Sequence, residues 1–156
     1  MLPFFHIICF RGEMYMTSIV ELKNGENNSN LIVQIENTLK TLGIPKPPQN
    51  LLPSIHEYQY LCEAILLVIT DEQFKNVRDN TIYTVIAKMH AGEWLSTTKR
   101  VEEGIKKAIQ SGWVWNEEYA DAWKTYFGFS NIDEEVCPKN LQFISTIAES
   151  LRSDLK

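Results

Sequence analysis

Hydrophobic residues recur at intervals of three and four positions in six separate stretches of the chain, and this is the spacing of one face of an α-helix. Glycine, proline or clustered polar residues separate each stretch from the next. The pattern therefore predicts an all-α fold, a compact bundle of about six helices. The apolar positions are Ile32, Ile35, Leu39 and Leu42; Tyr58, Leu61, Cys62, Ile65, Leu66 and Ile69; Ile82, Val85, Ile86 and Met89; Val101, Ile105, Ala108 and Ile109; Tyr119, Ala122, Trp123 and Tyr126; and Phe143, Ile144, Ile147, Ala148 and Leu151.

Residues that favour helix ends surround these stretches and predict their boundaries. Ser, Thr and Asn side chains accept hydrogen bonds from the first free backbone N–H groups of a helix, and glycine adopts the left-handed conformation that ends one. A segment with four prolines, 45–53, is expected to be an extended linker. The expected starts are Ser29 or Asn30, Ser54 with Glu57 as a capping box, Asn80, Ser96 to Thr98, Asn116, and Pro138 or Asn140; the expected stops are Gly43, Asp71–Glu72, Ala91–Gly92, Gly112 and Gly128.

The first thirty residues lack this clear pattern. Residues 16–22 could form a strand and Asn24–Gly25 a turn, but the segment as a whole carries no sustained periodicity. We therefore expect a weakly ordered N-terminal segment, 1–30, followed by one helical domain, 31–154.

Composition narrows the class of protein. An apolar share of 44% can fill a core without disulfides or metals, and Cys9, Cys62 and Cys137 lie too far apart for metal-ligand spacing. The chain lacks a membrane-length apolar segment and a signal peptide, so a cytoplasmic protein is expected. The net charge of −5 argues against nucleic-acid binding, unless one face carries the opposite charge.

The sequence gives no sign of an enzyme or of a cofactor. His6, His56 and His90 are isolated from matching carboxylates and cysteines, and we expect structural or surface roles for them. A phosphate-binding glycine loop and a nucleophile-elbow motif are both absent from the sequence. Trp113, Trp115 and Trp123 could stack on single-stranded bases, but their positions at helix ends and on apolar stripes favour packing in the core.

The segment 81–113 has the order of a helix-turn-helix motif, in which a second helix enters the major groove of DNA. Val101, Ile105, Ala108 and Ile109 would face the core. Between Lys88 and Lys107, five basic and three acidic side chains give this part a local positive charge. The opposite face would carry Lys99, Arg100, Glu103, Lys106, Lys107 and Gln110, with Glu102 on one flank.

A second interpretation fits the same residues. Glu102 and Lys106, like Glu103 and Lys107, stand four positions apart with the acid first, the order that stabilises any solvated helix. The connection Ala91–Leu95 is also longer than the usual three- or four-residue turn. From the pattern alone, an ordinary solvated helix pair and a DNA-reading motif both remain open.

A family resemblance favours the DNA-reading motif. The segment 31–152 resembles the C-terminal DNA-binding domain of the stage-zero sporulation response regulator, the transcription factor that controls entry into sporulation. Its order and spacing of short motifs carry the resemblance. These are Leu42-Gly43-Ile44-Pro45, the stretch from Tyr58 to Ile65, Ile86-Ala87-Lys88, Arg100-Val101-Glu102, Ala108-Ile109, Trp113, Phe127-Gly128, and the run of Pro138, Asn140, Phe143-Ile144, Ala148 and Leu151-Arg152.

The resemblance implies a six-helix DNA-binding domain without enzymatic activity or cofactor. It implies binding to a short duplex box, often as tandem copies or a homodimer on DNA, and contact with RNA polymerase. By position, Arg100 and Glu102 match residues that face the bases. The full set of residues expected to contact DNA is Lys88, Thr98, Lys99, Arg100, Glu102, Glu103, Lys106 and Lys107.

Three departures from the family change what is expected. Glu103 stands where the family has a base-reading arginine, so the sequence preference should differ. The turn before Ser96 is longer than in the family. A receiver domain precedes the family's domain, whereas the residues before 31 show no acidic run that could accept phosphate, so control by an internal receiver is not expected. A DNA-binding-deficient homologue that binds a full-length regulator or RNA polymerase is the alternative hypothesis.

Overall fold

In the computed structural model the described residues are 26–48, 54–74, 81–91, 96–113, 117–128 and 137–154. They form six α-helices and two short 3-10 turns, and no strand occurs among them, which confirms the predicted all-α class. The possible strand at 16–22 and the turn at Asn24–Gly25 lie outside the described residues. The helices are α3 (Glu26–Thr41), α4 (Ser54–Thr70), α5 (Thr81–Met89), α6 (Thr98–Trp113), α7 (Ala120–Phe127) and α8 (Asn140–Asp154), and the turns are η1 (Glu72–Phe74) and η2 (Glu117–Tyr119).

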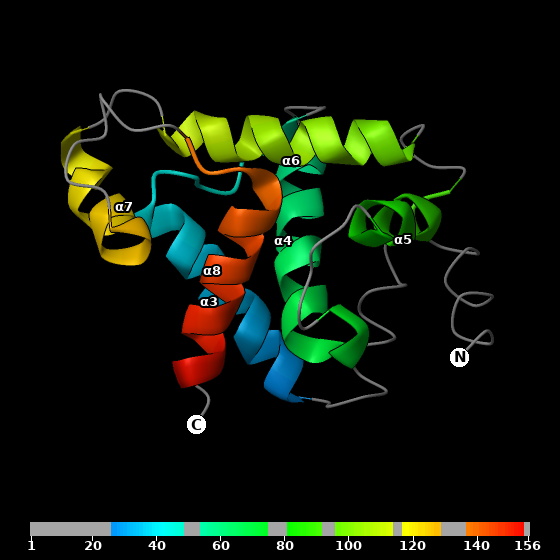
Figure 1. Ribbon diagram of the computed structural model, residues 1–156, viewed down its shortest axis with the longest axis horizontal. Coiled ribbons are helices and arrows are strands. Elements are labelled where there is room, and N and C mark those ends of the chain that lie inside the picture. Colours follow the sequence, from blue (N-terminus) through cyan, green and yellow to red (C-terminus); the bar gives the residue numbers. More distant parts are fainter. Residues whose placement is uncertain are drawn as a thin grey trace.

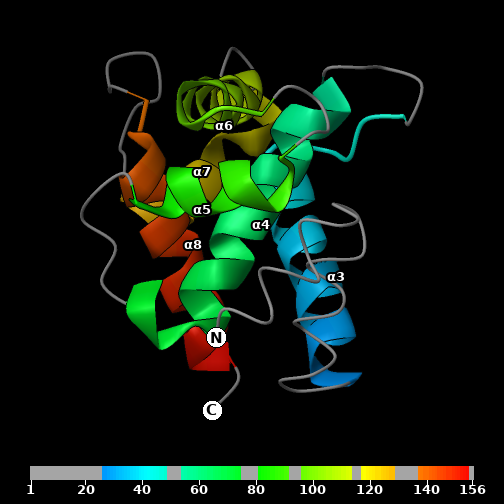
Figure 2. The ribbon, with the colours of Figure 1, turned by 90° about the vertical axis from the view of Figure 1, so that its right-hand side faces the viewer.

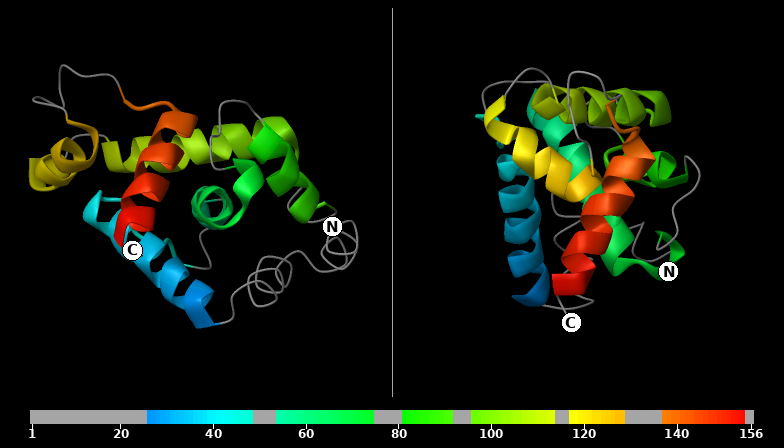
Figure 3. Two further views of the ribbon diagram at one scale, coloured as in Figure 1. Left: turned by 60° about the horizontal axis from the view of Figure 1, so that its bottom comes forward. Right: turned by 60° about the vertical axis from the view of Figure 1, so that its left-hand side comes forward.

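Helix α4 is the centre of the bundle. It packs against α3, α5, α6 and α8, and every residue from Ala64 to Val68 is buried, so the helix is enclosed around its circumference. Figure 1 shows α6 lying across one end of α4 and α8. Figure 2 shows the same helix end-on, above α5. The α3 and α8 helices flank α4 on the other side (Figure 3), so α6 is left with an outward face that the described helices do not cover.

The apolar stripes read from the sequence form the core. All of the predicted apolar positions are buried or half-buried, with Leu39, Leu61, Ile86, Ile105 and Ile147 fully so. Burial of such side chains contributes about 1.5–3 kcal/mol each. This confirms the helical register of all six stretches.

Several helix boundaries also match the predictions. Gly43 and Gly128 have φ of 79° and 75°, the left-handed conformation expected where α3 and α7 end. The backbone N–H of Arg100 donates to Thr97 Oγ1 at 3.1 Å, so Thr97 caps α6. Helix α4 starts at Ser54 and ends at Thr70, directly before η1, as the sequence indicates.

Two starts differ from the predictions. Helix α3 begins at Glu26, ahead of the expected caps Ser29 and Asn30, so the last part of the segment predicted to be weakly ordered is helical. The Asn and Ser residues before Leu31 are weak helix formers, at up to about 0.7 kcal/mol each relative to Ala, so the backward extension depends on the anchoring of Leu31 and Ile35 in the core. Helix α7 follows the turn η2, and Tyr119 occupies its N-cap without a side-chain cap bond.

Gly112 was wrongly predicted to end its helix, which continues to Trp113. Gly112 is buried, and its role is close packing. A Cβ atom at this position would overlap Ile44 Cγ1 and lie 2.6 Å from the carbonyl oxygen of Leu42. The end of α6 therefore rests directly on the turn that follows α3, and only glycine permits this approach.

Candidate nucleic-acid interface

Helix α6 has one buried and one exposed side, and its exposed side forms a ridge on the surface of the domain. Val101, Ile105, Ala108 and Ile109 are buried, as predicted. Gly104 is also buried, and a Cβ there would lie 3.0 Å from Tyr60 Cδ2, so this glycine lets α6 approach α4 closely. The exposed side carries Lys99, Arg100, Glu103, Lys106, Lys107 and Gln110.

Hydrogen bonds from three helices fix the position of α6. Tyr60 of α4 shares a 2.6 Å hydrogen bond with Ser96 Oγ, directly before α6. Asn140 of α8 donates from Nδ2 to the carbonyl oxygen of Glu102 at 2.9 Å. The hydroxyls of Thr84 in α5 and Thr98 in α6 lie 3.2 Å apart. The ridge is therefore held at both its start and its middle by the rest of the fold.

A buried polar pair joins α4 to the residue that follows α5. The two carboxylate oxygens of Glu63 lie 2.7 and 2.9 Å from Nε2 of His90, whose ring is fully buried at the end of α5. Tyr60 contacts the same ring edge-to-face, with 5.9 Å between ring centroids. Burial raises the pKa of the Glu63 carboxyl, and the hydrogen bond and charge of His90 oppose this rise. The interpretation of His90 as isolated from a matching carboxylate was wrong, because the fold brings Glu63 against its ring and buries the pair.

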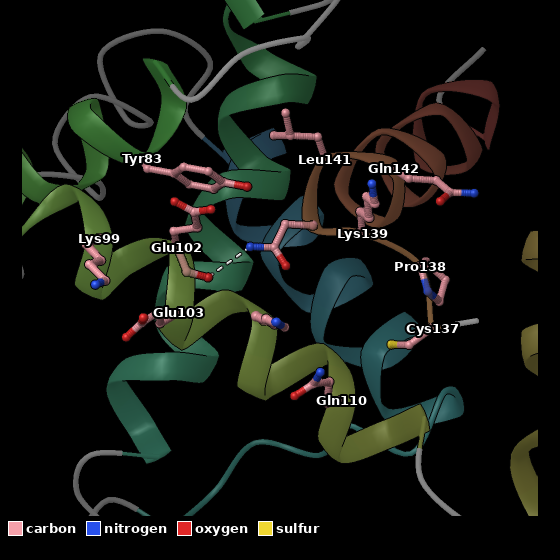
Figure 4. A pocket seen from close by; sticks show the side chains of 12 residues that line it. Tyr83, Lys99, Glu102, Glu103, Gln110, Cys137, Pro138, Lys139, Leu141 and Gln142 are labelled. Carbon is pink, nitrogen blue, oxygen red and sulfur yellow. Dashed lines mark hydrogen bonds between the residues drawn. The ribbon is translucent and has the colours of Figure 1, made fainter.

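Two grooves run along the sides of the ridge. The α6–α8 groove, of about 660 Å³, lies between α6 and the residues that lead into α8. Figure 4 shows Lys99, Glu102, Glu103 and Gln110 along one wall of it, Tyr83 at one end, and Cys137, Pro138 and Lys139 on the other wall. The α4–α6 groove, of about 380 Å³, is lined by residues that include His56, Glu57, Tyr60, Arg100 and Lys107.

Most of the side chains predicted to contact DNA lie on or beside the ridge. Lys99 and Glu103 line both grooves, so they stand on its crest. Arg100 and Lys107 face the α4–α6 groove, and Lys106 faces the α6–α8 groove.

The other three predicted residues are placed differently. Thr98 is half-buried and contacts Thr84, so its hydroxyl is directed at α5. Glu102 is half-buried on the flank toward α8. Lys88 is exposed on α5 but lines neither groove.

The ion pairs expected of an ordinary solvated helix do not form. In the part of the chain that the structure describes, neither Glu102 with Lys106 nor Glu103 with Lys107 lies within ion-pair distance. The pairs present there, Lys46–Glu36, His90–Glu63 and Arg152–Glu149, all lie outside α6. The cations of α6 are therefore not held in ion pairs with the neighbouring acids of the same helix.

The α4–α6 groove concentrates positive charge. Burial is the main cause that lowers the pKa of His56, and the charges of His90 and Arg100 lower it further. Lys99 and Lys107 line the same groove, where Glu57 and Glu103 are the carboxylates. A polyanion would meet three cations here, all from α6: Lys99, Arg100 and Lys107.

Sequence inspection did not select several residues of this surface. Lys139, Asn140 and Tyr83 line the α6–α8 groove, and His56 lines the other. These residues come from helices distant in the sequence, and periodicity within one helix carries no information about such neighbours. One sequence feature did point to a neighbouring helix: Gly104 interrupts the strong helical pattern of α6, and a glycine inside a helix often marks close packing.

Two of the three tryptophans considered for base stacking lie in or against the core. Trp123 is fully buried and Trp113 packs edge-to-face on it at 5.1 Å, which confirms core packing, while Trp115 lies outside the described residues. Cys62 and Cys137 are free thiols. The described side chains include no group of three or more His, Cys, Asp or Glu residues arranged to hold a metal ion. Each described helix is too short or too polar to cross a lipid bilayer.

Comparison with known protein families gives one match that spans this surface. The family described as "Sporulation initiation factor Spo0A C terminal" matches residues 35–151, about three quarters of the chain. The match begins in α3 and ends in α8, so it includes the whole ridge and both grooves.

Proposed function

The chain belongs to the Spo0A C-terminal family, the non-enzymatic DNA-binding effector domain of a sporulation transcription regulator, and from this premise we propose that it binds duplex DNA sequence-specifically through α6. The observation that carries the proposal is the exposed ridge of α6, whose cations are not paired with the acids of the same helix. A protruding helix is the element that the major groove of B-DNA, about 12 Å wide, admits.

The exposed side chains divide into two roles. Arg100 can donate two hydrogen bonds to guanine O6 and N7, and Glu103 on the crest can accept one from cytosine N4. Lys99, Lys106 and Lys107, with Lys88 on α5, would neutralise phosphates and set the register on the duplex. Because Thr98 contacts Thr84 and Glu102 is half-buried, we assign them smaller direct contributions than their sequence positions indicated.

The proposal extends to regulation. We infer that the domain binds DNA without phosphorylation. By the family premise, tandem or dimeric binding on DNA and contact with RNA polymerase belong to the same proposal. Binding of a duplex by the purified, unmodified chain tests the first of these statements.

Arg100→Ala is expected to weaken binding to the preferred duplex about 5- to 150-fold, since a bidentate arginine–guanine contact contributes about 1–3 kcal/mol of discrimination. The loss should be confined to duplexes that keep the contacted base pair, and fluorescence anisotropy with the preferred duplex and single-base variants measures it. Lys124→Ala, which removes an exposed cation from α7, is the matched control and should leave affinity unchanged. An equal loss on every duplex would contradict base reading by Arg100.

A second function has one observation in its favour. Glu103 stands exposed on the crest of α6, and the chain carries a net charge of −5. These features favour a partner protein over DNA, such as a full-length regulator or RNA polymerase. Co-purification with such a partner, together with absent binding to any duplex at low salt, would support this alternative over DNA reading.

A further inference from the structure

The wall of the α6–α8 groove opposite the ridge contains a cation outside the helix-turn-helix. Lys139 is exposed and precedes α8, and it faces the groove together with Lys99 and Lys106 of α6. Cations from two separate segments therefore line one groove, where the carboxylates are Glu102 and Glu103. None of the ion pairs in the described part of the chain includes Lys139.

Lys139 is held at a fixed position relative to the ridge. Its carbonyl oxygen accepts the backbone N–H of Phe143 at 2.9 Å, which makes Lys139 the N-cap residue that precedes α8. The next residue, Asn140, donates to the carbonyl oxygen of Glu102 in α6 at 2.9 Å. The dashed line in Figure 4 marks this bond.

Neighbouring side chains also stabilise this contact between α6 and the start of α8. Pro138 is buried on the other side of Lys139. Tyr83 of α5 is buried near Asn140; burial raises the pKa of Tyr83, and the side chain of Asn140 opposes this rise. Helices α5, α6 and α8 thus meet at Asn140, one residue from the Lys139 cation. Because the backbone at Lys139 is already fixed, contact with an anion needs to order only the lysine side chain.

We propose that the α6–α8 groove holds the sugar–phosphate backbone of one DNA strand beside the inserted ridge, and that Lys139 donates to a phosphate of that strand. The inference rests on the proposed function, because it needs α6 in the major groove. When a helix enters that groove, the backbones of the two strands lie on either side of it, and the two grooves flank α6 in the same way. The contact positions the protein and carries no base preference.

Lys139→Gln tests the contact, with Lys124→Gln as the matched loss of an exposed lysine on α7. Each phosphate contact contributes about 0.9 to the slope of log K against log salt, so Lys139→Gln should lower the slope by about that amount. The same relation gives a loss of about eightfold in affinity near 0.1 M salt. The loss should be equal on the preferred duplex and on its single-base variants, and Lys139→Arg should retain binding.

The outcomes separate this inference from the proposed function. If the wild-type chain binds no duplex, the proposed function fails and the inference fails with it. If the wild type binds and Arg100→Ala weakens it, but Lys139→Gln keeps the wild-type affinity and salt slope, only the phosphate contact is refuted. A loss limited to certain base pairs would also refute it. Unchanged melting temperatures of both Lys139 variants, expected for an exposed side chain, show that the fold is retained.

Discussion

Trp123→Ala should destabilise the domain by about 3–5 kcal/mol, the usual cost of truncating a fully buried aromatic residue. For a domain of this size, such a loss lowers the melting temperature by about 6–20 °C. Trp123 has no exposed surface and is the only fully buried side chain among the described residues of α7. Thermal unfolding followed by circular dichroism measures the change.

The contacts of Trp123 explain why the effect should be large. Its ring packs against Trp113, Phe127 and Phe143, with centroid distances of 5.1, 5.4 and 5.6 Å. Its Nε1–H donates to the carbonyl oxygen of Leu42 at 3.0 Å, the same oxygen that Gly112 approaches at the end of α6. The tryptophan therefore joins α7, α8 and the turn on which α6 rests.

Trp123→Phe is the graded control. It keeps most of the ring packing and removes the hydrogen bond to Leu42, so it should cost about 1–3 kcal/mol, the penalty of a lost partner for a buried polar group. A loss below about 1 kcal/mol for the alanine variant would fall outside the range for a buried aromatic residue. That result would contradict the docking of α7 on α8.

Glu63→Ala is expected to cost about 3–5 kcal/mol, because it removes one member of a buried polar pair and leaves a void beside His90. Glu63 joins α4 to the end of α5, directly before the connection to α6. Urea unfolding of the wild type and the variant gives the difference. Asp154→Ala, which removes an exposed carboxylate from the end of α8, should change stability by less than about 0.5 kcal/mol.

Glu63→Gln separates the charge from the shape of the side chain. Because burial raises the folded-state pKa of Glu63 above 4.5, its stabilising contribution is complete below that pH and is lost as pH rises through the folded-state pKa. Glutamine does not titrate, so the stability of the variant relative to wild type should increase with pH across this window. A difference that stays constant with pH would refute the raised pKa.

The stripes of apolar residues sufficed to predict the helical bundle, because burial at three- and four-residue spacing depends only on positions within one helix. Gly43 and Gly128 were predictable for the same reason, since a left-handed residue is a local requirement. Gly112 was not, because its need for space arises from Leu42 and Ile44, about seventy positions earlier in the chain. A rule based on the local sequence alone therefore predicts that such a glycine ends the helix.

The sequence predicted only the part of the candidate surface that depends on positions within one helix. Arg100, Lys106 and Lys107 could be placed outward from the helical register of α6 alone. The contact of Thr98 with Thr84 and the position of Lys139 depend on how helices pack, which no single-helix pattern specifies. The ion pairs expected from four-residue spacing did not form, since an exposed pair contributes at most a few tenths of a kcal/mol and long side chains readily adopt other conformations.

Selection of duplexes from a random library by the wild-type chain, at about 0.05 M and about 0.2 M salt, tests the central claim that α6 reads base sequence. We predict enrichment of one short motif at both salt concentrations, with an affinity for it that falls as salt rises because phosphate contacts contribute. The motif should survive at the higher concentration, where binding through phosphates alone is weakest. Recovery of the library without an enriched motif, or of no duplex at either concentration, would contradict the claim.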